Sequence, residues 1–162
     1  MGRRQKVKGS SREAAGEASG YQMDRITQER RSALMAKVRS AGTDIELRVR
    51  RVLHKAGYRY RVNAMGLPGR PDVVFKGRRK AIFVHGCFWH GHGGCKRSAL
   101  PVSRRDFWAA KIARNQRRDA DNCERLAGLG WSVLTVWQCE MEDDGELAAR
   151  LADFVGPPSI RR

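Results

Sequence analysis

Residues 84–95 constrain this chain more than any other stretch, because they crowd groups with opposite solvation needs into twelve positions. The segment reads Val-His-Gly-Cys-Phe-Trp-His-Gly-His-Gly-Gly-Cys and holds three of the four histidines and two of the four cysteines. A buried core segment would need a hydrogen-bond partner for each imidazole nitrogen. A solvated loop would not favour an adjacent phenylalanine and tryptophan. We therefore interpret the segment as a functional site.

The charge of the chain indicates a polyanionic partner. Lys and Arg number 33 against 17 Asp and Glu, which gives a net charge of +16 and a pI near 10.8. Such a surplus favours DNA or RNA as the partner. An anionic membrane surface is the alternative, but it usually selects one basic amphipathic helix, whereas the arginines here are spread along the whole chain.

Length and apolar content favour a single domain without a membrane span. A chain of 162 residues suffices for one hydrophobic core. Its longest apolar runs are strand-sized and far below a membrane span. No signal peptide is visible at the N-terminus, so we expect a cytoplasmic protein. The cysteines are then expected as thiols or metal ligands rather than disulfides.

The sequence pattern predicts an α/β domain with a central mixed β-sheet flanked by helices. We expect a basic disordered tail over 1–20, a domain over 21–156 that begins with an arm at 21–41, and a short tail over 157–162. Helices are expected over 24–40, from a Thr43-x-x-Glu46 capping box to near Gly57, and over 105–129 and 145–154; strands are expected over 58–62, 73–75, 81–84 and 131–137.

The cysteines and one histidine indicate a metal centre. Cys87, His92 and Cys95 lie within nine residues among several glycines, and Cys139 follows the last predicted strand. Three thiolates and one imidazole suit a closed tetrahedral zinc site, which would fix a loop that has little apolar content. Cys123 lies on a predicted helix, where core packing is the expected role.

Two further histidines and one aspartate indicate phosphodiester hydrolysis. If zinc takes His92, then His85 and His90 remain free, and Asp72 begins the strand next to the one that ends at His85. A carboxylate there would hold Mg²⁺, which prefers oxygen ligands and stabilises the attacking and leaving oxygens. An unligated histidine with a pKa near neutrality is suited to activating water.

The aromatic residues divide into core candidates and wedge candidates. Trp131 and Trp137 lie on an apolar predicted strand and are expected in the core. Phe88 and Trp89 lie among predicted ligands, where burial is harder to arrange, and such side chains can insert between base steps. Trp108 fits either role.

These motifs together resemble the very short patch repair (Vsr) mismatch endonucleases. The resemblance runs from about Thr27 to Glu140 and rests on four segments: Leu67-Pro68-Gly69-Arg70-Pro71-Asp72, His85 to His90, Asp106-Phe107-Trp108 and Val136-Trp137-Gln138-Cys139. It implies a fold related to the type II restriction endonucleases. It also implies an enzyme that nicks DNA on the 5′ side of the thymine in T:G mismatches left by deaminated 5-methylcytosine.

The resemblance also implies a role for each matching residue. Asp72 and the main-chain carbonyl of Val84 would bind Mg²⁺, with Glu46 supporting the water at that ion in addition to its cap. His90 would be the general base, oriented by Asp119, and His85 would assist at the scissile phosphate. The structural zinc would be held by Cys87, His92, Cys95 and Cys139. The side chains that would intercalate from the major groove are Phe88, Trp89 and Trp108. Met35 would enter from the minor groove.

Two positions depart from the family pattern. Val84 stands where a threonine is common, which a carbonyl ligand tolerates. The loop before Cys95 is one residue longer and richer in glycine, so His90 remains an alternative zinc ligand to His92, although that choice would remove the expected base.

Two functional alternatives remain open from the sequence. One is a noncatalytic, zinc-stabilised DNA-binding module, which would not need Asp72, His85, His90 or Asp119. The other is a related nuclease that recognises a different DNA. The expected partner in the main interpretation is double-stranded DNA with a T:G mismatch, acted on by a monomer without membrane contact, and mismatch-repair proteins are expected as further partners.

Overall fold

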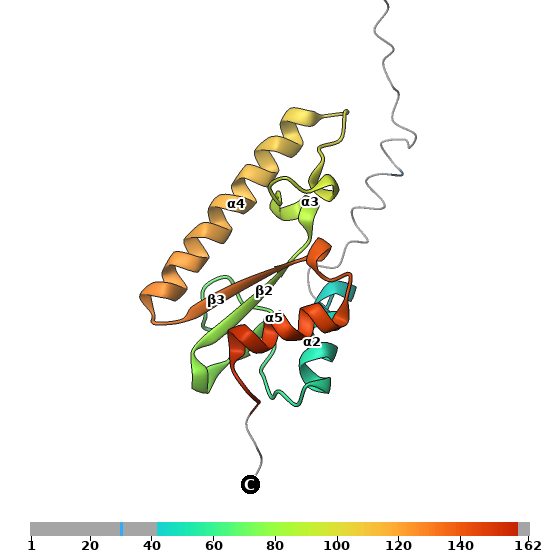
Figure 1. The fold of residues 1–162 in the computed structure, drawn as a ribbon. Coiled ribbons are helices and arrows are strands. Elements are labelled where there is room, and N and C mark those ends of the chain that lie inside the picture. Colours follow the sequence, from blue (N-terminus) through green and yellow to red (C-terminus); the bar gives the residue numbers. More distant parts are fainter. Residues whose placement is uncertain (1–29, 31–41, 159–162) are drawn as a thin grey trace, which may run out of the picture.

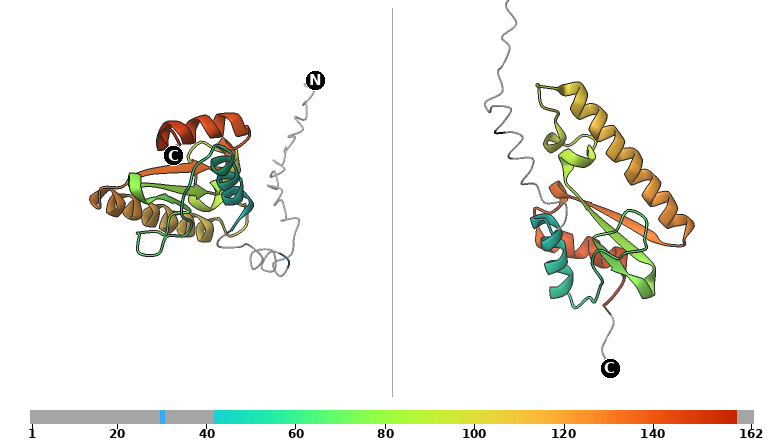
Figure 2. Two further views of the ribbon diagram at one scale, coloured as in Figure 1. Left: turned by 90° about the horizontal axis from the view of Figure 1, so that it is seen from below. Right: turned by 180° about the vertical axis from the view of Figure 1, so that it is seen from behind.

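The computed structural model describes residue 30 and residues 42–158, in which three layers are stacked (Figures 1 and 2). The sheet lies in the middle, with α2 and α5 on one face and α4 on the other. The helices are α2 (Asp44–Lys55), α3 (Cys87–His90), α4 (Arg105–Gly128) and α5 (Asp144–Val155), with short 3-10 turns at Lys76–Arg78, Lys96–Ser98 and Gln138–Glu140. The strands are β1 (Val73–Phe75), β2 (Lys80–His85) and β3 (Ser132–Trp137). The predicted tail over 1–20 and the predicted arm over 21–41, apart from residue 30, lie outside these residues. Of the predicted tail over 157–162, residues 157 and 158 are described.

The sheet is mixed, as the sequence predicts. Its order is β1-β2-β3; β1 runs antiparallel to β2, with Val73 opposite Ile82, and β3 runs parallel to β2, with Leu134 opposite Ile82. A parallel pair requires a long crossover between its strands. The 24-residue helix α4 provides that crossover.

The predicted strand over 58–62 is wrong. Only an isolated bridge joins Arg61 to Val74, and no ladder continues from it within the described chain. The tyrosines of this segment are anchored through their side chains instead: the Tyr58 hydroxyl donates to the Gly156 carbonyl at 2.7 Å and the Tyr60 hydroxyl to the Arg50 carbonyl at 2.8 Å. Together with the Arg61–Val74 bridge, these bonds hold the segment without a continuous strand ladder.

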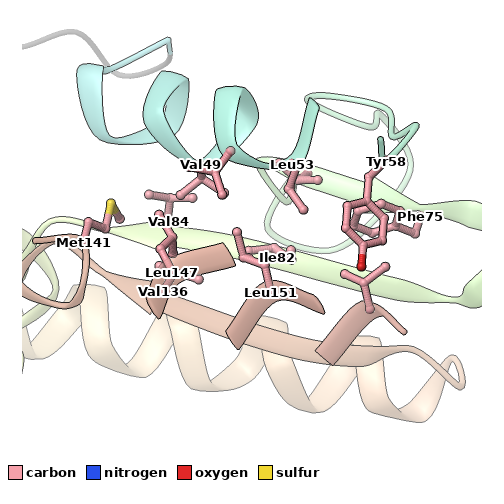
Figure 3. Close-up of a cluster of buried hydrophobic side chains, with 13 residues drawn as sticks. Val49, Leu53, Tyr58, Phe75, Ile82, Val84, Val136, Met141, Leu147 and Leu151 are labelled. Atoms are coloured by element: carbon pink, nitrogen blue, oxygen red, sulfur yellow. The ribbon is translucent and has the colours of Figure 1, made fainter. Parts of the chain in front are cut away.

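The alternation of side chains along β2 assigns the site to one face of the sheet. Ile82 and Val84 belong to the large apolar cluster beneath α2 and α5 (Figure 3). Ala81 and Phe83 belong to a smaller cluster beneath α4 with Leu126. The same period of two places His85 on the α4 side.

Helix α2 begins as its sequence indicates. The Thr43 hydroxyl accepts from the Glu46 backbone N–H, and the Glu46 carboxylate accepts from the Thr43 N–H, which completes the capping box. Among the residues that the structure describes, no helix has both the length and the apolar content needed to cross a membrane.

Truncation of Leu151, which is fully buried between α5 and the sheet, should destabilise the fold. Leu151→Ala removes apolar contacts and leaves a cavity, so the free energy of unfolding should fall by about 2–5 kcal/mol. Urea denaturation measures the change. Leu129→Ala, at a side chain that is 53% exposed, should change stability by less than about 0.5 kcal/mol; equal losses in the two variants would contradict the assigned core.

Candidate active site and metal centre

A hydrogen bond across the hairpin places Asp72 at the end of the sheet. Asp72 directly precedes β1, and its Oδ2 accepts from the Val84 backbone N–H at 2.8 Å. The carboxyl thereby lies beside the end of β2, one residue before His85. A cleft of about 1130 Å³ opens there, and its lining includes Glu46, Asp72, His85, His90, Arg118 and Asp119.

The position of His90 is fixed by two amide hydrogen bonds from α4 to the α3 turn. Asn115 Nδ2 donates to the Trp89 carbonyl at 2.8 Å, and Gln116 Nε2 donates to the Gly91 carbonyl at 2.9 Å. Gly91 has φ 61°, and a Cβ there would lie 2.5 Å from the Ile112 side chain. Only glycine permits this approach of the turn to the helix.

His85 and His90 form a stacked pair next to Asp119. Their rings are parallel within 10°, with centroids 3.7 Å apart. His90 Nδ1 lies 2.5 Å from Asp119 Oδ2, an arrangement that leaves Nε2 of His90 as the free acceptor nitrogen. Burial, together with the charge of His90, lowers the pKa of His85 to about 4, so His85 is neutral at pH 7.

The Asp119 carboxylate is suited to orient His90 because it is ionised. Burial alone would raise the pKa of Asp119, but the hydrogen bond and charge of His90 outweigh burial and lower that pKa below its ordinary value. An ionised carboxylate on Nδ1 holds the orientation of the His90 ring. This carboxylate–imidazole pair is the arrangement that a general base requires.

Asp72 and Glu46 are the acidic pair at the other side of the cleft. Burial raises the pKa of Asp72 to about 6, and the neighbouring charge of Glu46 adds to the rise, against the opposing effects of the Val84 hydrogen bond and Arg50. Glu46 also binds the Arg50 guanidinium at 3.1 Å. Glu46 therefore both caps α2 and faces the cleft.

A second group of side chains has the composition and spacing of a metal centre. The ligand atoms of Cys87, His92, Cys95 and Cys139 all lie within 4.8 Å of one another. His92 Nδ1 is 3.2 Å from Cys139 Sγ and 3.7 Å from Cys87 Sγ. Ligands about 2.0–2.3 Å from a tetrahedral ion are themselves roughly 3.3–3.8 Å apart. The spacing of the four side chains therefore fits tetrahedral coordination of one metal ion.

The electrostatics of these thiols also favour a cation. Burial raises the pKa of Cys139 to about 12, and the hydrogen bonds and charges of Cys87 and Cys95 add to the rise. In contrast, the backbone hydrogen bond from Arg97 lowers the pKa of Cys95. Three crowded thiols cannot all ionise without a compensating positive charge, which a bound metal ion supplies.

The two candidate histidines separate cleanly between the two groups. His92 lies with the three cysteines, whereas His90 lies with His85 and Asp119. Of the two histidines that the sequence leaves open, His92 therefore lies among the possible metal ligands and His90 lies at the cleft.

Trp137 departs from the core role that its strand pattern predicts. Its ring is only partly buried and stacks on His92, with centroids 4.2 Å apart and planes within 5°. It also meets His85 edge-on at 5.3 Å. The parallel register, which pairs His85 with Trp137, places this ring between the two groups.

The other aromatic candidates form one cluster at the α3–α4 junction. Phe88, Trp89 and Trp108 lie within 5.9 Å of one another by ring centroids and meet edge-on. Trp108 is 6% exposed, whereas Phe88 and Trp89 are half-buried. Phe107, which packs edge-on against Trp108, is 42% exposed. Met35 lies outside the described residues.

Several supporting residues escape a sequence interpretation. Asn115 and Gln116 share one face of α4 with Asp119, which the resemblance assigns, and their spacing of i, i+1 and i+4 is the available signal. Lys111 lies over the rings of Trp89 and Trp108 at 5.3 and 5.4 Å. No pattern in the sequence indicates that Arg50 lies behind the acidic pair.

Comparisons with known proteins identify DNA endonucleases as relatives of this chain. A family model described as DNA mismatch endonuclease Vsr matches residues 23–97. The type II nicking enzyme V.XorIIP of Xanthomonas oryzae pv. oryzae is 52% identical over 134 residues, which cover 83% of this chain and 98% of that protein. The DNA mismatch endonuclease Vsr of Escherichia coli is 40% identical over 130 residues, which cover 77% of this chain and 83% of that protein.

The fold, the cleft and these relatives define a DNA endonuclease, a hydrolase of the DNA repair class. The chain belongs to the Vsr family of DNA mismatch endonucleases.

Replacement of the buried carboxyl should stabilise the protein. The pKa of Asp72 is higher in the folded state, at about 6, than its ordinary 3.8. Its contribution to stability is therefore fully present below the unfolded pKa and is lost as pH rises through about 6. Without added Mg²⁺, Asp72→Asn should exceed the native chain in stability by up to about 3 kcal/mol at pH 8 and by almost nothing near pH 4.

Urea denaturation across this pH range measures the difference. Asp121→Asn is the matched control, because its side chain is 63% exposed and should change stability by less than about 0.5 kcal/mol. A gap between native chain and Asp72→Asn that does not vary with pH would contradict the assigned burial.

Proposed function

We propose that this endonuclease nicks one strand of duplex DNA on the 5′ side of the thymine in a T:G mismatch, the product of 5-methylcytosine deamination. The observation that carries the proposal is the convergence of Asp72 with the His90–Asp119 pair in one cleft, beside a partly exposed aromatic cluster. The noncatalytic alternative has no use for this arrangement.

We infer that Asp72 and the main-chain carbonyl of Val84 hold a catalytic Mg²⁺. The pKa of Asp72 is about 6, so its carboxyl ionises near neutral pH and offers the hard oxygen ligand that Mg²⁺ prefers. When bound, the ion stabilises negative charge on the attacking and leaving oxygens of the phosphodiester. Glu46 supports the water at this site through a remaining lone pair, since Oε1 accepts from Thr43 and Oε2 accepts from the Gly42 N–H and Arg50.

The proton transfer is assigned to the histidine pair. His90, held through Nδ1 by Asp119, takes the proton of the attacking water at Nε2. His85 is neutral at pH 7 because its pKa is about 4, so one ring nitrogen carries a hydrogen that can be donated to the scissile phosphate. The two histidines thus have separate roles.

The aromatic cluster supplies the preference for distorted DNA. Phe88, Trp89 and Trp108 enter the base stack from the major groove, and Met35 enters from the minor groove. Unstacking a base step costs a few kcal/mol and costs least at a mismatch. A wobble T:G pair is therefore the substrate that such a wedge selects.

The remaining assignments concern the framework. Zinc is the proposed occupant of the Cys87, His92, Cys95 and Cys139 group, since closed thiolate and imidazole sites of this kind are typical of structural zinc. We infer a restriction-endonuclease-like domain over 21–156 with an arm at 21–41, flanked by a basic tail at 1–20 and a short tail at 157–162. It acts as a monomer, with mismatch-repair proteins as further partners.

A nicking assay tests the proposed function. With Mg²⁺, the protein should nick the thymine strand of a duplex that carries one T:G pair, and should leave the matched T:A duplex largely intact. Asp72→Asn should lose at least a thousandfold in rate while it still binds the duplex. Equal cutting of both duplexes would favour a nuclease of different specificity, and full activity in the variant would remove Asp72 from the site.

Metal analysis tests the zinc assignment. We expect about one zinc per chain, and loss of zinc on strong chelation should lower Tm because the ion stabilises only the folded state. Cys139→Ser should lose most of the zinc. Cys123→Ser is the matched control, since Cys123 lies on α4 outside the group, and it should retain the metal; folded protein without zinc would refute the assignment.

A further inference from the structure

Arg70 is an unpaired cation at the edge of the catalytic cleft. Its exposed side chain lines the cleft, as does that of Arg118. Arg118 lies 3.8 Å from Asp119. Within residues 42–158, Arg70 forms neither an ion pair nor a side-chain hydrogen bond, although four carboxylates line the same cleft.

Three of those carboxylates have other partners, and the fourth, Asp44, lies exposed in the first turn of α2. Glu46 binds Arg50 and the α2 N-terminus, Asp72 accepts from the Val84 N–H, and Asp119 holds His90. The positive charge of Arg70 is therefore left for an anion from outside the protein. A phosphate group is an anion whose geometry matches the arginine fork.

The backbone at Arg70 is held in an unfavourable conformation. Its φ is 50°, in the left-handed region that costs a non-glycine residue free energy. The preceding Gly69 packs so closely on Asn122 of α4 that a Cβ would lie 2.8 Å from that side chain. The Arg70 N–H also donates to the Leu67 carbonyl at 3.2 Å. A glycine would satisfy this turn better, so stability alone does not explain the arginine.

A cation is also what this cleft requires to admit its substrate. A phosphodiester that approaches Asp72, Glu46 and Asp119 meets three acidic groups, and their repulsion opposes binding. A guanidinium on the rim offsets part of that repulsion.

We propose that Arg70 binds a backbone phosphate of the nicked strand next to the scissile phosphate, and so holds the DNA in register over the cleft. The proposal deepens the function proposed above, and it rests on duplex DNA being the substrate. Arg70 acts as a positioning residue for the reaction, because its phosphate is not the one that is cut.

The salt dependence of DNA binding tests this role. Each phosphate contact contributes about 0.9 to the slope of log K against log salt concentration. Arg70→Gln should therefore lower the slope by about 0.9 and weaken binding about tenfold at low salt. Arg51→Gln removes the same charge from an exposed position of α2 outside the cleft lining, and should leave the slope unchanged within error. Arg70→Lys should retain part of the affinity.

A glycine variant separates binding from folding. Arg70→Gly relieves the left-handed backbone, so Tm should stay equal or rise, while DNA affinity falls as in Arg70→Gln. Native affinity and slope in Arg70→Gly or Arg70→Gln would overturn the proposal. Losses of the same size in Arg51→Gln would also overturn it, since they would reflect net charge alone.

Binding is measured without Mg²⁺ on duplexes with and without a T:G pair. The outcome for Arg70 is therefore independent of whether the native enzyme nicks T:G sites: a native protein that nicks no mismatch but shows the Arg70-dependent slope would contradict only the proposed specificity.

Discussion

The close approach of the Gly91 turn to α4 is the contact on which both groups of the site depend. Because residue 91 has no Cβ, the turn packs directly on Ile112, and two amides of α4 reach its carbonyls. One residue before the turn lies the histidine of the catalytic pair, and one residue after it lies the histidine of the metal group. A single reversal of the backbone thus places the His90 imidazole in the catalytic pair and the His92 imidazole in the metal group.

The cleft also shows how a strongly basic protein keeps its reactive groups in defined charge states. The net charge of +16 favours association with DNA. The pKa values of the acidic groups in the cleft are set instead by burial and by neighbours a few ångströms away. Burial protonates Asp72 below pH 6, while His90 keeps Asp119 ionised. Two aspartates in one cleft therefore have pKa values shifted in opposite directions because their surroundings differ.

Local sequence patterns predicted most of the elements but fewer of the contacts. The capping box, the hairpin, the long helix and the last strand follow from periodicity and turn residues. The strand expected over 58–62 failed because its tyrosines bond to distant carbonyls, which no local pattern reveals. Resemblance placed Asp119 with His90, whereas the separation of His90 from His92, the position of Trp137 and the buried Arg50 required the register of the sheet and the packing of α4.

The contact between His92 and Cys139 spans 47 residues, and everything between them, including α4 and β3, lies within the loop that it closes. Loop closure of this length carries an entropic penalty that short metal-binding hairpins avoid. We therefore expect the Cys87, His92, Cys95 and Cys139 side chains to come together late in folding, once α4 has crossed the sheet and β3 lies parallel beside β2. Parallel pairing of this kind is a slow, non-local step in folding. Because Cys139 follows β3, the complete set of four ligands exists only in a chain that has the native strand order.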